Sequence, residues 1–192
     1  MDESVSKSLI QEESEKALKC LQSGGVLVYP TDTVWGIGCL PHSESGLERI
    51  KTLKNRLTKE GLIVLMRDRS VLKEYVDVPV VAEHLMDEVQ EPLTLIYPKS
   101  KKDLPGIQGS NGSLAVRIPI HPFCQDLLQH LDLPLVSTSA NMSGDPAPKF
   151  RNEIDPRVLL AADYVVNLPS SGGAMASSIY KISLEGELEQ IR

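Results

Sequence analysis

Two polar segments of the chain bring together hydroxyl groups, a carboxylate and glycines, which are groups that bind small polar ligands. The first covers residues 29–38 and holds Thr31-Asp32-Thr33, followed by glycines that let the backbone approach a ligand closely. The second, residues 137–146, has four hydroxyls and an amide within seven positions, which can donate hydrogen bonds to an oxyanion or a phosphate. Each segment taken alone is also typical of a turn or an ordinary polar loop.

Two further segments supply positive charge. Residues 54–61 contain Lys54, Arg56 and Lys59 after an expected helix, where cations either complement the helix dipole in solvent or clamp a phosphate. Arg117 stands inside an otherwise apolar strand. Because an unpaired buried charge is very costly, Arg117 must reach solvent, pair with an acid or meet an anionic ligand such as a carboxylate. Four such segments in one small domain favour one shared pocket over four unrelated loops.

Hydrophobic periodicity predicts the short helices and strands that must position these segments. We expect the first helix to stop at Gly24-Gly25, and a second to begin near Ser45 with a capping box. His121 is expected to start a later helix rather than to act as a base. A mixed sheet covered by helices is the economical arrangement of these elements. The expected helices cover residues 8–22, 80–90 and segments from 45 and 121, and the expected strands cover residues 26–29, 62–66, 93–97, 114–118, 135–137, 164–166, 178–182 and 188–191.

The composition predicts a single globular domain over residues 1–192. The chain has 20 Lys and Arg against 26 Asp and Glu, a formal net charge of −6, and 41% hydrophobic residues. Because a net negative chain is poorly suited to neutralising many phosphates, RNA binding would have to rest on the local basic patch of residues 49–59. No apolar run reaches the ~20 residues that span a bilayer, and the acidic start is unlike a targeting peptide. We therefore expect a cytoplasmic protein with free thiols and no membrane segment.

Several common catalytic signatures are missing from the sequence. It contains no GxxxxGK[ST] phosphate loop, no GxGxxG after a strand, no HExxH and no GxSxG. The three cysteines form no CxxC pair, and the four histidines show no metal-ligand spacing. If the protein is an enzyme, it is therefore not a P-loop NTPase, a Rossmann dehydrogenase or a metalloprotease.

In their order along the chain, the four polar segments resemble the YrdC/Sua5 family, the threonylcarbamoyl-AMP synthases of tRNA modification. The resemblance extends over about residues 24–192, and its first and last motifs are long and rarely found together elsewhere. The motifs are Gly25-Val26-Leu27-Val28-Tyr29-Pro30-Thr31-Asp32-Thr33-Val34-Trp35-Gly36, Lys54-Asn55-Arg56, Pro92-Leu93-Thr94, Ala115-Val116-Arg117 and Ser137-Thr138-Ser139-Ala140-Asn141.

The resemblance implies an α+β fold of the YrdC/RibB type, a twisted mixed β-sheet covered by helices around one deep basic cleft. It also implies a nucleotidyltransferase that makes threonylcarbamoyl-AMP and pyrophosphate from L-threonine, bicarbonate or CO2, and ATP, for the t6A37 modification of tRNA. Mg²⁺ is expected to accompany ATP, no organic cofactor is expected, and a separate transfer complex would receive the product. Because neither chemical step needs a protein nucleophile, positioning of the reactants and cations over the phosphates would suffice.

The resemblance also assigns roles to individual residues. Arg117 would hold the threonine carboxylate, and Lys59 would replace a cation that the family usually carries one position later. The residues expected to bind threonine are Thr33, Arg117, Ser137 and Ser177. Those expected to bind ATP are Lys54, Arg56, Lys59, Ser113, Ser139, Asn141 and Arg192.

Four departures from the family pattern keep other functions open, and one of them is that the tryptophan which often precedes the Pro-Leu-Thr segment is missing. Glu60 places a carboxylate where a cation is usual, so either Lys59 takes over or Mg²⁺ bridges Glu60 to the phosphates. Ala147 replaces a serine, and Leu65 replaces a histidine found in some members. Two other functions stay open: a paralogue with altered activity, and an RNA-binding or ribosome-maturation factor. Weak tRNA binding stays open as well. A hydrogenase-maturation relative is set aside because the chain lacks its zinc-finger and acylphosphatase segments.

Overall fold

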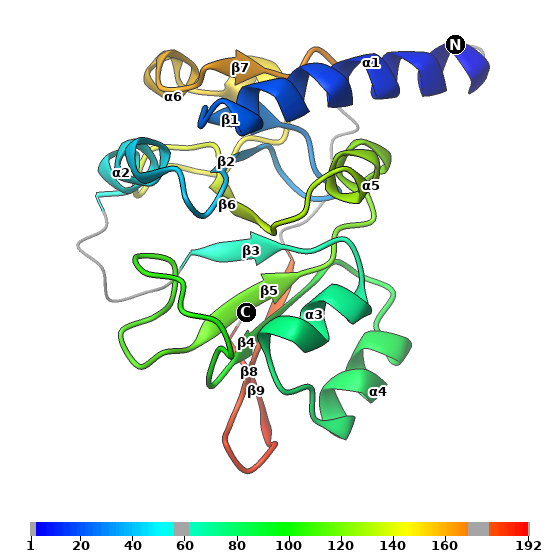
Figure 1. Cartoon of the computed structure of the whole chain (residues 1–192), viewed down its shortest axis with the longest axis vertical. Coiled ribbons are helices and arrows are strands. Elements are labelled where there is room, and N and C mark those ends of the chain that lie inside the picture. Colours follow the sequence, from blue (N-terminus) through cyan, green and yellow to red (C-terminus); the bar gives the residue numbers. More distant parts are fainter. Residues whose placement is uncertain (1–2, 56–61, 169–176, 192) are drawn as a thin grey trace.

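The computed structural model describes residues 3–55, 62–168 and 177–191, which form one mixed β-sheet with its helices (Figure 1). The nine strands found there lie in the order β7-β1-β2-β6-β3-β5-β4-β8-β9. The pairs β1–β7, β3–β5 and β4–β8 are parallel, and the other five are antiparallel. The predicted α+β class with a mixed sheet is confirmed. The helices are α1 (Glu3–Gln22), α2 (Glu44–Leu53), α3 (Arg69–Tyr75), α4 (Val80–Glu88), α5 (Pro122–Gln129), the 3-10 helix η1 (Arg151–Glu153) and α6 (Pro156–Leu160); the strands are β1 (Leu27–Tyr29), β2 (Gly36–Cys39), β3 (Ile63–Leu65), β4 (Leu93–Tyr97), β5 (Leu114–Arg117), β6 (Leu135–Ser139), β7 (Tyr164–Val165), β8 (Ser178–Ile182) and β9 (Leu188–Gln190).

Side-chain alternation along the strands divides the core into two layers. Leu27 and Tyr29 of β1 join one layer with the apolar residues of α1 and α5. Val26 and Val28 join the other layer, with the apolar residues of α2, α3 and α4. Figure 1 shows α1 and α5 beside the half of the sheet that contains β1 and β6, while α3 and α4 lie beside the half that contains β4 and β5. None of the described helices is long and apolar enough to cross a membrane.

The start of α2 is hydrogen-bonded to the turn that follows α1. As predicted, α1 stops before the glycine pair, and Gly24 has a φ of +79°, a conformation that glycine adopts without steric cost. The predicted capping residue of α2 was wrong, because the cap is Ser43 and not Ser45. The Ser43 hydroxyl accepts a hydrogen bond from Gly46 N at 3.2 Å and donates one to Gly24 O at 2.6 Å. The Ser43 side chain therefore caps the start of α2 and also holds the turn that follows α1.

Strand β2 and helix α3 were not predicted from hydrophobic periodicity. Strand β2 contains two glycines, which have low strand propensity, yet all four of its residues are buried between β1 and β6. Helix α3 has seven residues and begins at Asp68, whose carboxylate accepts hydrogen bonds from Ser70 N and Val71 N. In both cases tertiary packing or a cap outweighs intrinsic propensity.

Helix α5 begins where it was expected, and His121 is its N-cap. The His121 Nδ1 accepts a hydrogen bond from Phe123 N at 3.2 Å, and Pro122 occupies the first helical position. The role predicted for His121, a helix-start residue, is confirmed. Burial lowers the pKa of the imidazole from its usual 6.5, against a smaller opposite effect of Asp32. The neutral ring that can accept the capping hydrogen bond is therefore favoured.

This cap predicts a pH-dependent stability. Because the pKa of His121 in the folded protein lies below its unfolded value of 6.5, its contribution is fully present above pH 6.5. That contribution is lost as the pH falls through the lower folded pKa. Chemical denaturation should show that the wild-type protein loses more free energy of unfolding than His121→Asn between about pH 7.5 and about pH 5.5, since asparagine caps a helix without titrating. Equal losses in the two proteins would contradict this role.

Candidate active site

A cavity of about 210 Å³ brings together the residues predicted to bind threonine. All four of them line it, namely Thr33, Arg117, Ser137 and Ser177. Ser139, from the predicted nucleotide group, lies in the same wall, as do Leu65 and Ala147, two of the positions that depart from the family pattern. Residues separated by more than a hundred positions in the chain thus meet at one site.

The strand register explains this convergence. Arg117 pairs with Leu65 on one side and with Thr94 on the other. Ser137 pairs with Gly38 and with Ile63, so its side chain lies on the same face of the sheet as Leu65. Leu65 belongs to the core layer of α1 and α5, so the cavity opens on that face, beyond the area covered by those helices.

Arg117 is held by two neighbours from one loop. Its Nη1 donates a hydrogen bond to Thr33 Oγ1 at 2.8 Å, and its Nη2 forms an ion pair with Asp32 Oδ2 at 2.7 Å. Both side chains of the ion pair are buried, with 9% and 10% of their surfaces exposed. Arg117 Nε and Asp32 Oδ1 are also buried and have no hydrogen-bond partner among the described residues. Of the three environments open to this arginine from the sequence, the structure shows pairing with an acid, and it leaves a donor for an anionic ligand.

The hydrogen-bond network fixes which way the Thr33 hydroxyl points. Thr31 Oγ1 donates to Val34 O at 2.7 Å, so in the contact between the two threonine hydroxyls, at 3.0 Å, Thr33 must be the donor. Thr33 Oγ1 already accepts a hydrogen bond from Arg117, which leaves it one lone pair. Thr33 therefore offers an acceptor to a ligand, such as an ammonium or a hydroxyl proton.

Ser137 and Ser177, the other two hydroxyl residues predicted to bind threonine, each contact a buried hydroxyl. Tyr29 donates to Ser137 Oγ at 2.6 Å, and Thr94 Oγ1 lies 2.9 Å from Ser177 Oγ. The sequence did not assign site roles to Asp32, Tyr29 or Thr94. All three stand inside the motifs that carried the family resemblance, which was the available signal.

Lys54 organises the predicted nucleotide loop. It is the C-cap of α2 and is only 6% exposed. Its Nζ donates to Asn141 Oδ1 at 2.7 Å, Asn141 O at 2.8 Å and Ser139 Oγ at 3.3 Å. Three of the residues predicted to bind ATP therefore contact one another. In this geometry Lys54 anchors the loop that presents Ser139 and Asn141, and its predicted contact with ATP stays a prediction.

This anchor predicts a stability effect. Lys54→Met should lower the free energy of unfolding by about 1–3 kcal/mol, because it leaves the Asn141 acceptors without their charged donor. Thermal unfolding in the absence of any ligand measures this loss. Lys51→Met is the matched control on the same helix, since among the described residues Lys51 makes only a 3.6 Å ion pair with the exposed Glu48. Equal melting temperatures for the two variants would exclude the anchoring role.

The remaining predicted nucleotide residues divide into two groups. Ser113 precedes β5 and donates its backbone N–H to Asn111 Oδ1 at 3.1 Å, but it does not line the 210 Å³ cavity. Arg56, Lys59 and Arg192 lie outside the described residues, as does Glu60. Their assigned roles stay predictions from the resemblance.

None of the three cysteines lines the 210 Å³ cavity, and all three have raised thiol pKa values. Burial raises the pKa of the Cys39 thiol to about 12 and that of Cys20 to about 11, and it raises the pKa of Cys124 further. These thiols are therefore protonated and inert at neutral pH. Within residues 3–55, 62–168 and 177–191, no cluster of three His, Cys, Asp or Glu side chains could hold a metal ion.

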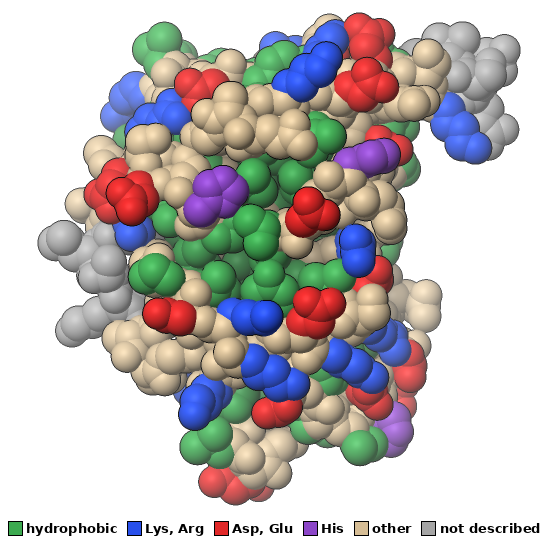
Figure 2. All heavy atoms as spheres, in the orientation of Figure 1, with side chains coloured by type: hydrophobic (Ala, Val, Ile, Leu, Met, Phe, Trp, Pro, Cys, Tyr) green, Lys and Arg blue, Asp and Glu red, His purple; other side chains and the backbone are tan. Residues whose placement is uncertain are grey.

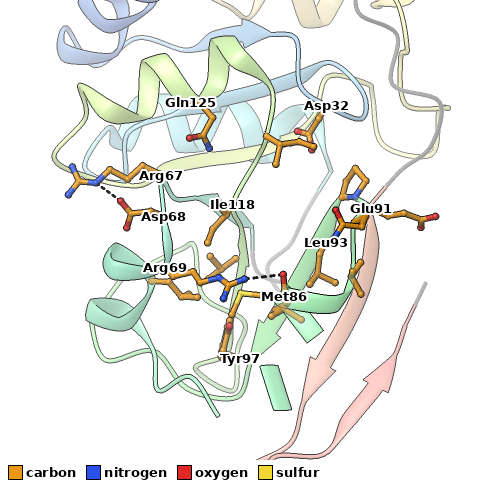
Figure 3. Close-up of a pocket in the computed structure, with 17 residues that line it drawn as sticks. Asp32, Arg67, Asp68, Arg69, Met86, Glu91, Leu93, Tyr97, Ile118 and Gln125 are labelled. Carbon is orange, nitrogen blue, oxygen red and sulfur yellow. Dashed lines mark hydrogen bonds and ion pairs between the residues drawn. The ribbon is translucent and has the colours of Figure 1, made fainter. Parts of the chain in front are cut away.

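A larger cavity, of about 670 Å³, is lined by side chains on the opposite face of β4 and β5, together with Asp32 and Gln125 (Figure 3). Its lining includes Val116 and Ile118, which alternate with Arg117 along β5. Figure 3 shows its two arginines engaged within the protein: Arg67 Nε is 3.2 Å from Asp68 Oδ2, and Arg69 Nη2 donates to Met86 O at 3.0 Å. Figure 2 shows apolar side chains gathered at the centre of the face seen in Figure 1, with charged side chains around them.

Comparisons of sequence show which proteins the chain is similar to. A protein-family model for Sua5, YciO and YrdC, described as "Telomere recombination", matches residues 19–192. A threonylcarbamoyl-AMP synthase of Xylella fastidiosa is 34% identical over 168 residues, which are 85% of this chain and 90% of the relative. A threonylcarbamoyl-AMP synthase of Xanthomonas euvesicatoria is 35% identical over 166 residues, which are 84% of this chain and 88% of the relative.

Solved structures show the same fold. E. coli YciO superimposes with a TM-score of 0.78 at 26% identity, and the match covers 94% of this chain and 90% of YciO. P. abyssi Sua5 complexed with L-threonine gives a TM-score of 0.82 at 24% identity. That match covers 93% of this chain and 53% of Sua5, so the chain spans about half the length of that protein.

Proposed function

The chain belongs to the Sua5/YciO/YrdC family, and from that premise we propose that it is a threonylcarbamoyl-AMP synthase. The observation that carries the proposal is Arg117, a buried cation on a cavity wall with Thr33, Ser137 and Ser177 around it. A cavity of 210 Å³ is smaller than the 300–1,000 Å³ typical of drug-sized ligands, and its size suits a single amino acid. The curated relatives named above have this activity in their names.

The geometry supplies the groups that an L-threonine substrate needs. The Arg117 guanidinium, with donors left over beyond Thr33 and Asp32, would bind the carboxylate. Thr33 offers an acceptor to the ammonium or the side-chain hydroxyl. The amine, once free of its extra proton, would add to CO2 with loss of a proton, or to bicarbonate with loss of water. The carbamate oxygen would then attack the α-phosphate of ATP with release of pyrophosphate. Holding the reactants in this order can supply about 7–11 kcal/mol of the barrier, so no protein nucleophile is needed.

ATP would lie on the side of the cavity where Ser139 and the loop anchored by Lys54 are found. Mg²⁺ would enter with ATP as part of the substrate, because Mg²⁺ is commonly held through substrate phosphates and a few carboxylates. The product would pass to a tRNA-modifying transfer complex, in the cytoplasm. The alternative, an RNA-binding factor without synthase activity, has less support, since the net charge is −6 and the curated relatives are named as synthases.

The test is pyrophosphate release by the purified protein, with the adenylate product identified by mass spectrometry. Release should require threonine, bicarbonate and Mg-ATP together, and omission of any one should abolish it. Release that proceeds without threonine would contradict the proposal, as would binding of RNA without any release of pyrophosphate.

A further inference from the structure

Tyr29 stands directly behind the wall of the 210 Å³ cavity. Its hydroxyl donates a 2.6 Å hydrogen bond to Ser137 Oγ, and Ser137 lines the cavity. Tyr29 itself has none of its surface exposed and is absent from the cavity lining. Any influence of Tyr29 on a ligand must therefore pass through Ser137.

The ring of Tyr29 lies against two glycines of the neighbouring strand. Tyr29 pairs with Gly36 across β1 and β2, and Gly38 stands two residues further along β2. A Cβ atom at Gly36 would lie 3.1 Å from Tyr29 Cζ, and one at Gly38 would lie 3.2 Å from its hydroxyl oxygen. On the other side, the ring of Phe123 is 6.4 Å away between centroids. The two glycines leave the space that brings the tyrosine hydroxyl to Ser137.

The hydrogen bond sets the direction of the Ser137 hydroxyl. Burial raises the pKa of Tyr29 well above its usual value of 10, so the phenol stays protonated and donates. Ser137 Oγ accepts that proton, and its own proton has no acceptor among the residues that the structure describes. A serine hydroxyl carries one donor and two lone pairs, so Ser137 keeps its donor for the cavity.

We propose that Tyr29 is a positioning residue that holds Ser137 as a hydrogen-bond donor toward an acceptor oxygen of the amino-acid substrate. This inference rests on the proposed synthase function and deepens it. The wall then presents a donor at Ser137 and an acceptor at Thr33, in addition to the cation of Arg117. Such a set matches an amino acid that carries a carboxylate, an ammonium and a hydroxyl.

The experiment is a double-mutant cycle with Tyr29→Phe, Ser137→Ala and the double variant, assayed by pyrophosphate release. Tyr29→Phe should raise the KM for threonine about three- to tenfold, the effect of one lost hydrogen bond, and leave the KM for ATP unchanged. The double variant should be no worse than Ser137→Ala, because Tyr29 acts only through that serine. Tyr97→Phe is the matched control, since Tyr97 is equally buried and its hydroxyl has no hydrogen-bond partner among the described residues. We expect Tyr97→Phe to leave the KM for threonine unchanged.

Three results would overturn the inference. The first is an unchanged threonine KM in Tyr29→Phe when Ser137→Ala raises it. The second is an additive loss in the double variant. The third is a large fall in the melting temperature of Tyr29→Phe relative to Tyr97→Phe, which would make the hydroxyl chiefly structural. Wild-type protein that releases no threonine-dependent pyrophosphate would instead contradict the synthase proposal, so the two failures are distinguishable.

Discussion

Arg117→Lys is expected to fold normally and to lose most threonine-dependent pyrophosphate release. Lysine keeps a positive charge next to Asp32 but replaces the planar fork with a single ammonium, which cannot bond Thr33, Asp32 and a carboxylate in the same geometry. The kcat/KM for threonine should fall about 10- to 100-fold, since a hydrogen bond to a charged group contributes about 1.5–3 kcal/mol. Titration of threonine at saturating Mg-ATP measures it, and a normal KM for threonine would refute the assigned role.

Arg117→Ala tests the same residue through stability. It leaves the Asp32 carboxylate buried without its partner, and breaking a buried pair in this way costs about 3–5 kcal/mol. Arg117→Ala combined with Asp32→Asn should recover much of that loss in urea denaturation, because the amide carries no charge. The same double variant should remain inactive with threonine. Activity in that variant would mean that Arg117 serves the fold alone.

The sequence could predict the site residues better than their partners. An arginine inside an apolar strand indicates a buried charge, but periodicity cannot say which acid lies nearby. Asp32 is 85 positions away, and the pairing of β2 with β6, of β6 with β3 and of β3 with β5 brings its loop to Arg117. Arg117 was assigned to the threonine site through the family motif, and the motif carried no information about the ion pair.

Local signals predicted some helix ends and missed others. The end of α1 at a glycine pair and the start of α5 at His121-Pro122 were predicted, because glycine favours the end of a helix and proline favours its first position. The cap of α2 was placed two residues late, because Ser43 and Ser45 are equally good caps and the contact of Ser43 with Gly24 is tertiary. Lys54 looked like a helix-end cation in solvent or a phosphate clamp, and its bonds to Asn141 could not be foreseen.

The glycines of strand β2 have a packing role that the sequence did not reveal. They were interpreted as freedom for the backbone to approach a ligand, and Gly36 does line the 210 Å³ cavity. In the structure Gly36 and Gly38 also make room for a neighbouring strand and for Tyr29. A Cβ at Gly38 would lie 2.2 Å from Val136 O, a backbone atom of β6 that no side-chain rotation can move. A methyl group at position 38 should therefore destabilise the sheet.

Gly38→Ala should be the most destabilising methyl addition in this sheet. The added Cβ must push β2 away from β6 at the pair Gly38–Ser137, so we expect the free energy of unfolding to fall by about 2–4 kcal/mol. Gly36→Ala is the matched control one pleat away, where the nearest atom is Cζ of the Tyr29 ring at 3.1 Å. A ring edge can shift by a few tenths of an ångström, so Gly36→Ala should lower the free energy of unfolding by less than Gly38→Ala does.

Urea denaturation of both variants measures the difference, and unchanged m-values would show that the comparison concerns the native state. Gly36→Ala displaces the ring that holds Ser137, so it should raise the threonine KM more than its small stability loss would suggest. Gly38→Ala should lower the stability and also raise the threonine KM, because Val136 directly precedes Ser137 on β6. If Gly38→Ala were as stable as Gly36→Ala, the β2–β6 contact would be looser than the structure shows, and the site wall would not depend on it.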